Sequence, residues 1–548
     1  MNLVTRALNF NLSNRLILVP SRTLRARRAT RIGRMVSSAS TVSVSADVAK
    51  DYESLCDKLR EISTLGGIGG LLQWDEAVMM PAGAAESRGK QKSVLAGVVY
   101  EKETSQELGK LLKTLTMHNK DLEPVPAAVV RDAQRRYVRN TAISKELAQR
   151  RAELESEGYV KWVKARDEAD FSQFAPVLQE WVDLLKKYAG AIDSRRPIYD
   201  VLLDDFEKGM TTTRLDQIFT EVREGLVPLI QDIKQKGTKP DSSLLAGSFD
   251  TKAQAALCNA IAVDLGFSLE QGRLDVSVHP FTGGTHPTDV RMTTRFKEHD
   301  LTEGLTGAIH ETGHSLYEQG RSLEHDGLPV NEALSMGVHE SQSLLWERMV
   351  ALSQPFAHYL LPKLQEHFPD LAQKLSPESL YSAVNVIREP SMIRVEADEV
   401  TYPLHIILRY ELEQQLLAGD ISIEEVPRLW NEKMTEYLGC TPKDDAQGVL
   451  QDVHWSAGIM GYFPTYTLGA MYACQIYQKA CEDIPSLEKE IAAGNFKPLR
   501  DWLKVKIHQV GSLHPNGDEL MKAVTGSPLD PSVFLKYLRT KYTALYNL

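Results

Sequence analysis

The segment Ala308-Ile-His310-Glu311-Thr-Gly-His314-Ser-Leu-Tyr-Glu318 decides how the rest of this chain is interpreted. It carries an H-E-x-x-H pattern, and on a helix side chains four positions apart lie on one face. Both imidazoles can therefore reach one ion, with ring nitrogens about 2.0–2.1 Å from a zinc ion. In the alternative reading, the two histidines only cap or pack the helix. The small residues Gly307, Ala308 and Gly313 favour the metal site, because they keep the helix slim.

Glu311 follows the first histidine directly and is rotated away from the two imidazoles. This position places it beside the vacant coordination position of the metal. There it can take a proton from the water that the metal activates and pass it to a leaving amine. The segment therefore predicts a hydrolase with His310 and His314 as metal ligands and Glu311 as the catalytic acid and base.

A catalytic zinc site needs a third protein ligand and an open fourth position. We expect the first helix to run to about Gln319 and to be followed by Gly- and Pro-containing breaks. A second helix is expected to begin near Asn331 and to return antiparallel to the first. It carries Glu340, 26 residues beyond His314, which is the third ligand that the spacing favours. The competing ligands are Glu318, Glu332, His339 and Glu347.

Further motifs follow one another along the chain. They read Gln73-Trp74-Asp75 with Met80-Pro81, His279-Pro280-Phe281, Asp289-Val-Arg291-Met-Thr293, His339-Glu340-Ser341-Gln342, Ile393-Arg394-Val-Glu-Ala397-Asp398 and Gly448-Val-Leu-Gln451-Asp452-Val-His454-Trp455. Together with the H-E-x-x-H segment, they resemble the Taq-type metallocarboxypeptidases, a family named for a thermostable bacterial enzyme. The resemblance covers about residues 50–548.

This resemblance implies a mainly α-helical, saddle-shaped catalytic body with a deep groove and very few short strands. It implies a homodimer and the release of single amino acids from peptide C-termini with broad specificity. It also implies one zinc ion per chain, in some members cobalt, held by His310, His314 and Glu340.

A carboxypeptidase must recognise a free C-terminal carboxylate, for which a planar guanidinium is the best bidentate partner. Arg394 lies among apolar neighbours in a segment expected to be helical, where it is either a paired structural ion or a substrate clamp. The resemblance favours the clamp. Arg291 is the second candidate, and its neighbours favour a network that shapes the closed end of the groove. The resemblance also places His279 near the groove, without a chemical role.

His454 and Tyr462 are candidates to hold the oxyanion as the tetrahedral intermediate forms, with Tyr466 as the rival of Tyr462. Their proposed role follows an analogy with other helical metallopeptidases. In the alternative, the aromatic residues are part of the core and His454 is hydrogen-bonded beneath them. Metal-bound histidines usually donate their second N–H to a carboxylate or carbonyl. Asp398 and Asp452 are the candidate partners.

The chain is expected to be mainly helical from about residue 47 onward, with one body over residues 47–548. Apolar residues recur at three- and four-residue spacing in several segments, for example 143–169, 173–192 and 360–374. The clearest strand signal is residues 273–279. Gly- and Pro-rich breaks are expected near residues 65–70, 80–84, 236–247, 280–287 and 513–516.

Residues 1–46 contain eight arginines and no Asp, Glu or Lys, and they are rich in Ser. This composition is typical of a cleaved organelle transit peptide, with the chloroplast placed ahead of the mitochondrion. In the alternative it is a basic arm that binds nucleic acid. Removal of these eight arginines takes the formal net charge from −10 to −18. So acidic a protein is a poor partner for nucleic acid.

The composition is that of a soluble globular protein, with 43% hydrophobic and 25% charged residues. No apolar run approaches the roughly 20 residues that span a bilayer, so no membrane partner is expected. The five cysteines are scattered and odd in number, which argues against a disulfide framework and for a reducing compartment.

Two other functions stay open at this point. A thimet-type zinc oligopeptidase also carries H-E-x-x-H with a Glu about 25 residues later, but it would cut inside peptides. A non-catalytic helical scaffold would use zinc structurally, with four protein ligands and no need for Glu311.

Overall fold

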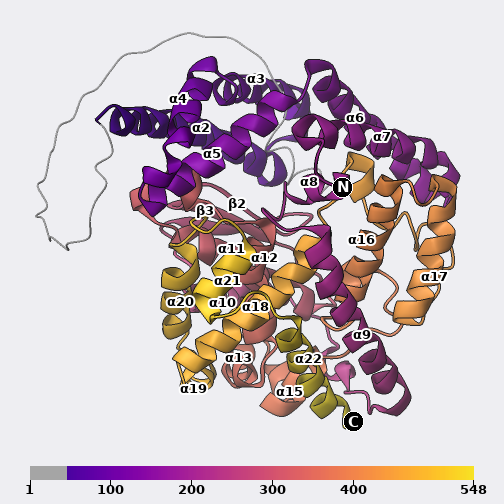
Figure 1. The fold of residues 1–548 in the computed structure, drawn as a ribbon. Helices are drawn as coiled ribbons and strands as arrows, with labels where there is room; N and C mark the ends of the chain where they lie inside the picture. Colours follow the sequence, from indigo (N-terminus) through magenta and orange to yellow (C-terminus); the bar gives the residue numbers. More distant parts are fainter. Residues whose placement is uncertain (1–45) are drawn as a thin grey trace, which may run out of the picture.

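The computed structural model describes residues 46–548, so nearly all of the predicted transit segment lies outside the described residues. The described chain is mainly α-helical with three short strands, which confirms the expected fold class (Figure 1). Its α-helices are α2 (Ala46–Val78), α3 (Ala85–Glu103), α4 (Gln106–Met117), α5 (Pro124–Ala142), α6 (Lys145–Asp167), α7 (Ala175–Asp193), α8 (Ile198–Leu203), α9 (Thr212–Lys236), α10 (Thr251–Leu265), α11 (Leu301–Gly320), α12 (Met336–Leu344), α13 (Gln354–His367), α14 (Pro369–Ala372), α15 (Pro377–Val384), α16 (Tyr402–Ala418), α17 (Val426–Leu438), α18 (Pro464–Asp483), α19 (Leu487–Ala492), α20 (Lys497–Leu503), α21 (Gly517–Thr525) and α22 (Pro531–Tyr546).

The three strands form one small sheet in the order β1-β3-β2. They are β1 (Gly272–Val276), β2 (Phe281–His286) and β3 (Asp289–Thr294). β1 runs parallel to β3, whereas β2 is antiparallel to it and bulges between Gly284 and His286. The predicted strand at 273–279 therefore corresponds to β1. The break expected at 280–287 instead holds β2, because its backbone pairs with β3.

Helix α2 runs without interruption through residues 65–70, where a break was expected. At these positions the glycines allow another part of the backbone to approach the helix closely. A Cβ atom on Gly67 would clash with the backbone of Thr285, and one on Gly70 would clash with the backbone of Gly284. These glycines let α2 lie directly on strand β2, and this contact outweighs the helix-weakening effect of glycine.

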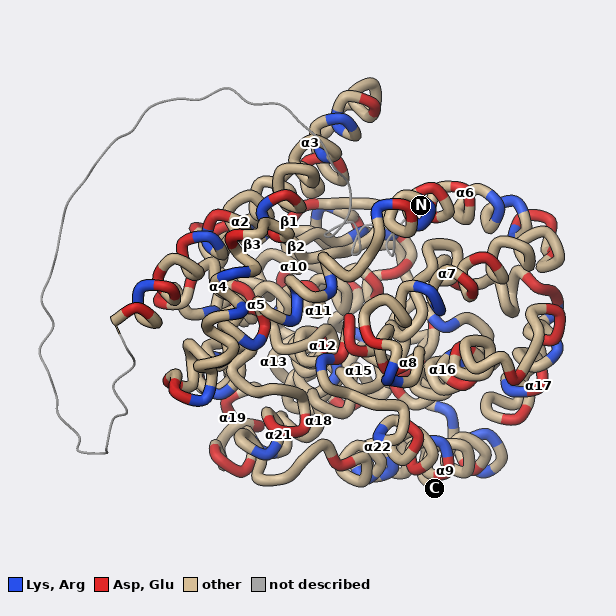
Figure 2. The backbone as a smooth tube through the Cα atoms, turned by 45° about the horizontal axis from the view of Figure 1, so that its top comes forward, with Lys and Arg blue, Asp and Glu red and all other residues tan. Residues whose placement is uncertain are grey.

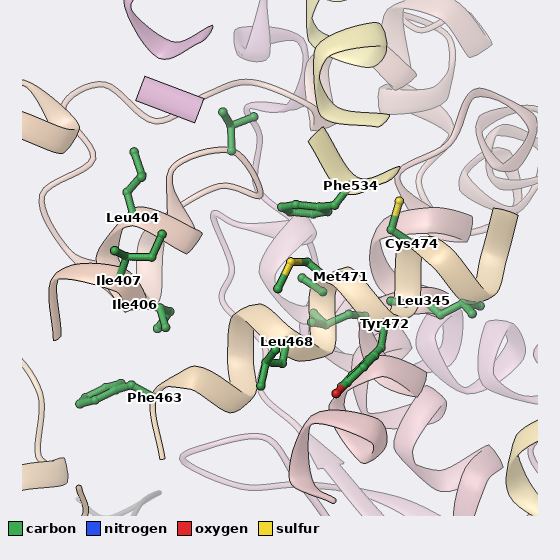
Figure 3. Packing of buried hydrophobic residues seen from close by; sticks show 14 of the residues in the cluster. Leu345, Leu404, Ile406, Ile407, Phe463, Leu468, Met471, Tyr472, Cys474 and Phe534 are labelled. Atoms are coloured by element: carbon green, nitrogen blue, oxygen red, sulfur yellow. The ribbon is translucent and has the colours of Figure 1, made fainter. Parts of the chain in front are cut away.

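Helix α18 lies at the centre of the largest hydrophobic core (Figure 3). Leu468, Met471 and Tyr472 project from it into the same core as Leu404 of α16 and Phe534 of α22. Helices α2, α4 and α5 enclose a second, smaller core. The N-terminal helices lie together at one end of the molecule, over the strands (Figure 1). The prediction of one catalytic domain over 47–548 stays a prediction.

Helices α11 and α12 approach each other closely at Gly313, where a Cβ atom would meet the backbone of Gln342 and Ser343. Helix α12 begins at Met336 instead of near Asn331. Pro329–Asn331 forms a separate 3-10 turn. Ser335 then caps α12, with its hydroxyl accepting from the Val338 N–H at 3.1 Å.

Basic and acidic residues are interspersed along the outer helices, as α6, α7 and α9 show in Figure 2. Within residues 46–548, no helix is both long and apolar enough to cross a membrane. All five cysteines lie within the described residues and are free.

Candidate metal centre

The structure brings His310, His314 and Glu340 together, and one ligand atom of each lies within 4.8 Å of the others. A Glu340 carboxylate oxygen is 3.3 Å from Nε2 of His314 and 3.8 Å from Nε2 of His310. The two histidines come from α11 and the glutamate from α12. Two nitrogens and one oxygen facing a common point form a donor set that suits a divalent metal ion.

The second nitrogen of each histidine is also fixed. Nδ1 of His310 lies 2.6 Å from Glu347, and Nδ1 of His314 lies 2.6 Å from Nδ1 of His339. Nε2 of His339 in turn lies 2.9 Å from Glu318, which is paired with Arg321 at 2.6 Å. Three of the competing ligands thus hold the histidines in place, as is usual around protein metal sites.

The two candidate partners that the sequence offered, Asp398 and Asp452, bind elsewhere, because Glu347 and His339 hold the Nδ1 atoms of the two histidines. Asp398 accepts the backbone N–H groups of Arg388, Val400 and Thr401 and orders the start of α16. Asp452 pairs with two buried arginines. Glu332, the fourth competing ligand, is bound by Arg136.

The electrostatics of the three residues fit a cation. Burial lowers the pKa of His310, but the Glu340 and Glu347 carboxylates outweigh it and raise this pKa to about 10. Burial lowers the pKa of His314 to about 4. Burial alone would raise the pKa of Glu340, but His310 and His314 outweigh this effect and lower it to about 2. Without a metal, His310 therefore carries one positive charge between the Glu340 and Glu347 carboxylates. A divalent cation held by the two neutral imidazoles and Glu340 would supply positive charge at the same place.

Glu311 is buried on α11, on the side that faces β2. Its carboxylate accepts a hydrogen bond from the Thr282 hydroxyl at 2.7 Å. Burial raises the pKa of Glu311 to about 7, although His310 and Thr282 act to lower it. A carboxyl group with such a pKa can both accept and donate a proton near neutral pH.

Arg394 is 5% exposed and lies in a single 3-10 turn, Arg394–Glu396, instead of the expected longer helix. Its Nε and Nη2 atoms donate to one Asp452 oxygen at 2.9 and 2.7 Å. Its Nη1 donates to the Tyr402 hydroxyl at 2.7 Å. Arg409 binds the second oxygen of Asp452 at 2.6 Å. This geometry fits the paired structural ion, which was one of the two alternatives for Arg394.

His454 is buried, and its Nε2 lies 3.5 Å from the Tyr466 hydroxyl. Its ring lies 4.4 Å from that of Phe463 and 5.7 Å from that of Tyr462. Burial, aided by Arg394, lowers the pKa of His454 to about 3, so the ring is neutral. This arrangement fits the alternative in which His454 lies beneath the aromatic residues. Tyr462 and Tyr466 both lie near enough to Glu340 for its charge to raise their pKa values.

The remaining predicted residues lie around the sheet. Arg291 pairs with Asp289 at 2.8 Å, and its guanidinium stacks 4.6 Å from the ring centre of Trp74. Arg291 thereby joins β3 to helix α2. His279 lies on the loop between β1 and β2, and its carbonyl accepts from Thr293 at 3.5 Å. The neighbouring Pro280 lies beside Gly307 of α11.

Two residues near the metal centre were missed by the sequence reasoning, Tyr402 and Arg348. Tyr402 lies near Glu340, and the guanidinium groups of Arg348 and Arg394 are 5.5 and 5.8 Å from its ring centre. Neither residue belongs to a motif that was recognised. The one available signal for Arg348 was its position directly after Glu347, a competing ligand.

This donor set, the adjacent Glu311 and the helical body define a metallopeptidase of the H-E-x-x-H class. The chain belongs to the carboxypeptidase Taq (M32) metallopeptidase family, whose model matches residues 54–542. It is therefore a metallocarboxypeptidase, and the family does not favour the oligopeptidase alternative.

Individual relatives agree over nearly their whole length. Thermostable carboxypeptidase 1 of Thermus thermophilus is 40% identical over 508 residues, which cover 90% of this chain and 99% of that protein. Carboxypeptidase 1 of Bacillus subtilis is 37% identical over 492 residues, which cover 90% and 98%. The solved M32 carboxypeptidase from Deinococcus radiodurans R1 superposes with a TM-score of 0.87 at 35% identity, covering 91% of this chain and 100% of that one.

Proposed function

We propose that the enzyme is a zinc carboxypeptidase that releases single amino acids from peptide C-termini with broad side-chain tolerance. The observation that carries the proposal is the convergence of His310, His314 and Glu340 beside Glu311. When bound, zinc or the alternative cobalt supplies Lewis acidity that activates water and polarises the scissile carbonyl. The three residues supply three ligands and leave a position for substrate or water.

Glu311 is the proton carrier in this proposal. The Thr282 hydroxyl, 2.7 Å from its carboxylate, fixes the orientation of the group. Burial favours its neutral form, and a bound cation nearby would favour the ionised form, so that Glu311 can change protonation state during turnover. It accepts the proton of the attacking water and returns it to the leaving amine.

Tyr462 is proposed to donate its hydroxyl to the developing oxyanion, with Tyr466 as its rival. His454 is proposed to help hold the oxyanion through Tyr466, whose hydroxyl lies 3.5 Å from Nε2 of His454. Arg291 and His279 are proposed to shape the end of the site where the substrate binds. Arg291 lies in strand β3, and His279 lies on the loop between β1 and β2. Arg394 is proposed to act on the substrate carboxylate, either directly or through Tyr402.

The test uses a short peptide with a free C-terminus and its C-terminal amide, with products followed by mass spectrometry. Zinc-loaded wild type should remove single C-terminal residues from the acid only. Glu311→Gln should lose roughly 100- to 10,000-fold in rate and keep its metal. The matched control is Glu303→Gln, a half-buried residue in the first turn of the same helix that pairs with Arg295 and Lys297, and it should retain wild-type activity. Internal cleavage of both peptides would move the enzyme to the oligopeptidase class.

An organellar location is proposed from residues 1–46, which combine eight arginines with no acidic residue. The chloroplast is placed ahead of the mitochondrion. Sequencing the N-terminus of the protein isolated from fractionated cells tests this location. An unprocessed N-terminus in the cytosolic fraction would contradict it.

A homodimer is proposed from the family resemblance. Light scattering on the purified protein tests it, with an expected mass about twice the 61.3 kDa of the full chain, or slightly less after processing. A monomer at micromolar concentration would contradict it.

A further inference from the structure

Glu413 of α16 is fully buried, and three neutral groups donate hydrogen bonds to its carboxylate. The Trp455 indole N–H binds one oxygen at 2.9 Å. The Gly461 backbone N–H and the Tyr199 hydroxyl bind the other oxygen, at 3.0 and 2.9 Å. Apolar residues of similar volume are often at least as stabilising as a buried charge, so stability alone does not explain an acidic residue at this position.

Glu413 acts together with Arg409 on one segment of the chain. The two residues lie four positions apart on α16, so they share a helix face, and both are fully buried. Arg409 binds Asp452 at 2.6 Å. The segment 452–461 that follows is irregular apart from one 3-10 turn, His454–Ala457. A buried segment of this kind depends on groups outside it to satisfy its polar atoms, and α16 supplies them.

The Glu413 carboxylate joins the two ends of the turn that leads to Tyr462. Trp455 and Gly461 bind its two oxygens. Gly461 has a φ of +88°, and a Cβ atom there would lie 2.8 Å from the backbone nitrogen of Leu203 in α8. Gly461 is thus fixed between α8 and Glu413, and Tyr462 is the next residue.

The side chain of Tyr462 extends from this turn toward the metal centre. It is half-buried, and its ring centre lies 5.1 Å from that of Phe206 and 5.2 Å from that of Tyr466. Burial, aided by the nearby Glu340 carboxylate, raises the pKa of Tyr462. Its hydroxyl is therefore protonated and can donate a hydrogen bond. The turn sets where this side chain begins.

We infer that Glu413 is a positioning residue for the reaction, which holds the turn at Gly461 so that the Tyr462 hydroxyl meets the developing oxyanion. This inference rests on the proposed function. A donor has to lie about 2.7–3.1 Å from the oxyanion, so a small shift of the turn removes much of the stabilisation. Glutamine cannot replace Glu413, because its NH2 group would face the N–H of Trp455 or of Gly461. Both of these groups only donate.

Steady-state kinetics of the zinc-loaded enzyme on a peptide with a free C-terminus test the inference. Burial raises the pKa of Glu413 to about 7, so the assay is run at about pH 8, where the group is mostly ionised. Glu413→Gln should lower kcat by about 10- to 100-fold with little change in KM, because the donor acts in the transition state. The matched control is Tyr199→Phe, which removes a hydrogen bond from the same carboxylate and leaves both bonds to the turn in place. It should keep kcat within about twofold of wild type.

A double-mutant cycle with Tyr462→Phe separates positioning from a general loss of structure. Tyr462→Phe alone should lower kcat by at least as much as Glu413→Gln. Adding Glu413→Gln to it should cost less than about twofold more, because the group that Glu413 positions is then absent. The same loss in both backgrounds would overturn the inference, as would an equal loss of kcat in Tyr199→Phe.

The double variant of Glu413→Gln with Trp455→Phe is the second protein to measure in case Glu413→Gln alone fails to fold. Phenylalanine removes the donor that would oppose the new amide group, and the amide oxygen can still accept the Gly461 N–H. The kcat of this double variant should lie above that of Tyr462→Phe, and a lower value would contradict the inference. Zinc content and thermal midpoint show that each variant is intact.

Wild-type kcat in Glu413→Gln or in Tyr462→Phe would also overturn the inference. Both results leave the release of single C-terminal residues by wild type in place. Failure of the proposed function would instead appear as internal cleavage by wild type.

Discussion

Gly469 of α18 lies directly against the side chain of Glu340, and a Cβ atom at this position would be 2.8 Å from Cγ of Glu340. The same Cβ would lie 3.2 Å from the backbone oxygen of Gly337. The third metal ligand thus has a place only because position 469 has no side chain. Helix α18, which contributes to the largest hydrophobic core, therefore also sets the position of Glu340.

We therefore expect Gly469→Ala to displace Glu340 and to weaken zinc binding by at least about 10-fold, a loss typical of a disturbed metal-site support. Competition with a chromogenic chelator measures the affinity. The control is Gly190→Ala, on the exposed side of α7, where no atom lies within 4 Å of the added Cβ. Wild-type zinc affinity in Gly469→Ala would show that Glu340 does not bind the metal in this position.

The carboxylate of Glu347 should contribute to metal affinity through His310. Glu347→Gln removes the charged partner of Nδ1, which orients the ring and raises its basicity. We expect a 10- to 100-fold loss of zinc affinity, measured by chelator competition at constant pH. Glu432→Gln, in an exposed pair with Arg428, should have no effect. An equal loss in both variants would point to general electrostatics.

The buried ion triad of Arg394, Arg409 and Asp452 should be essential for stability. Asp452→Asn removes the one carboxylate that both arginines share. Breaking a buried pair leaves uncompensated charge and typically costs 3–5 kcal/mol. We expect a markedly lower thermal midpoint, measured by calorimetry. The surface variant Glu86→Gln, which breaks an exposed pair with Lys90, should change stability by less than about 1 kcal/mol. A similar midpoint in both variants would contradict the role of the triad.

The sequence was sufficient for the fold class and for the convergence of His310, His314 and Glu340, because both depend on local spacing. His310 and His314 share a helix face, and Glu340 returns on the next helix. The segment between α11 and α12 is also a break that contains Gly and Pro, as expected. The start of α12 was displaced because Pro329–Asn331 formed its own turn.

Tertiary contacts account for what the sequence did not reveal. The four glycines within residues 66–70 would weaken an isolated helix. Two of them, Gly67 and Gly70, are needed because the backbone of β2 lies against them. The supports of His310 and His314 were sought at Asp398 and Asp452, whereas Glu347, His339 and Glu318 serve instead. Their side chains meet only after α11 and α12 pack. The position of Arg348 beside the Tyr402 ring likewise depends on tertiary packing, which no local pattern encodes.

A last prediction concerns Glu207, whose carboxyl group accepts the N–H of Gly337 at the start of α12. Burial raises the pKa of Glu207 to about 8 from its ordinary value near 4.5. Below pH 4.5 the group is protonated in both the folded and the unfolded chain. Between about pH 4.5 and 8 the unfolded chain releases the proton and the folded chain keeps it. Stability is therefore lost as pH rises through this window.

Glu207→Gln removes this dependence, because an amide does not titrate and its oxygen can still accept the Gly337 N–H. We expect wild type to lose stability relative to the variant by up to about 1.4 kcal/mol per pH unit between pH 5 and 8. Thermal midpoints of both proteins across that range measure the difference. For the exposed control Glu432→Gln the difference from wild type should stay flat. A midpoint difference for Glu207→Gln that is equally flat would mean that Glu207 is ionised in the folded enzyme and that α12 begins on a carboxylate.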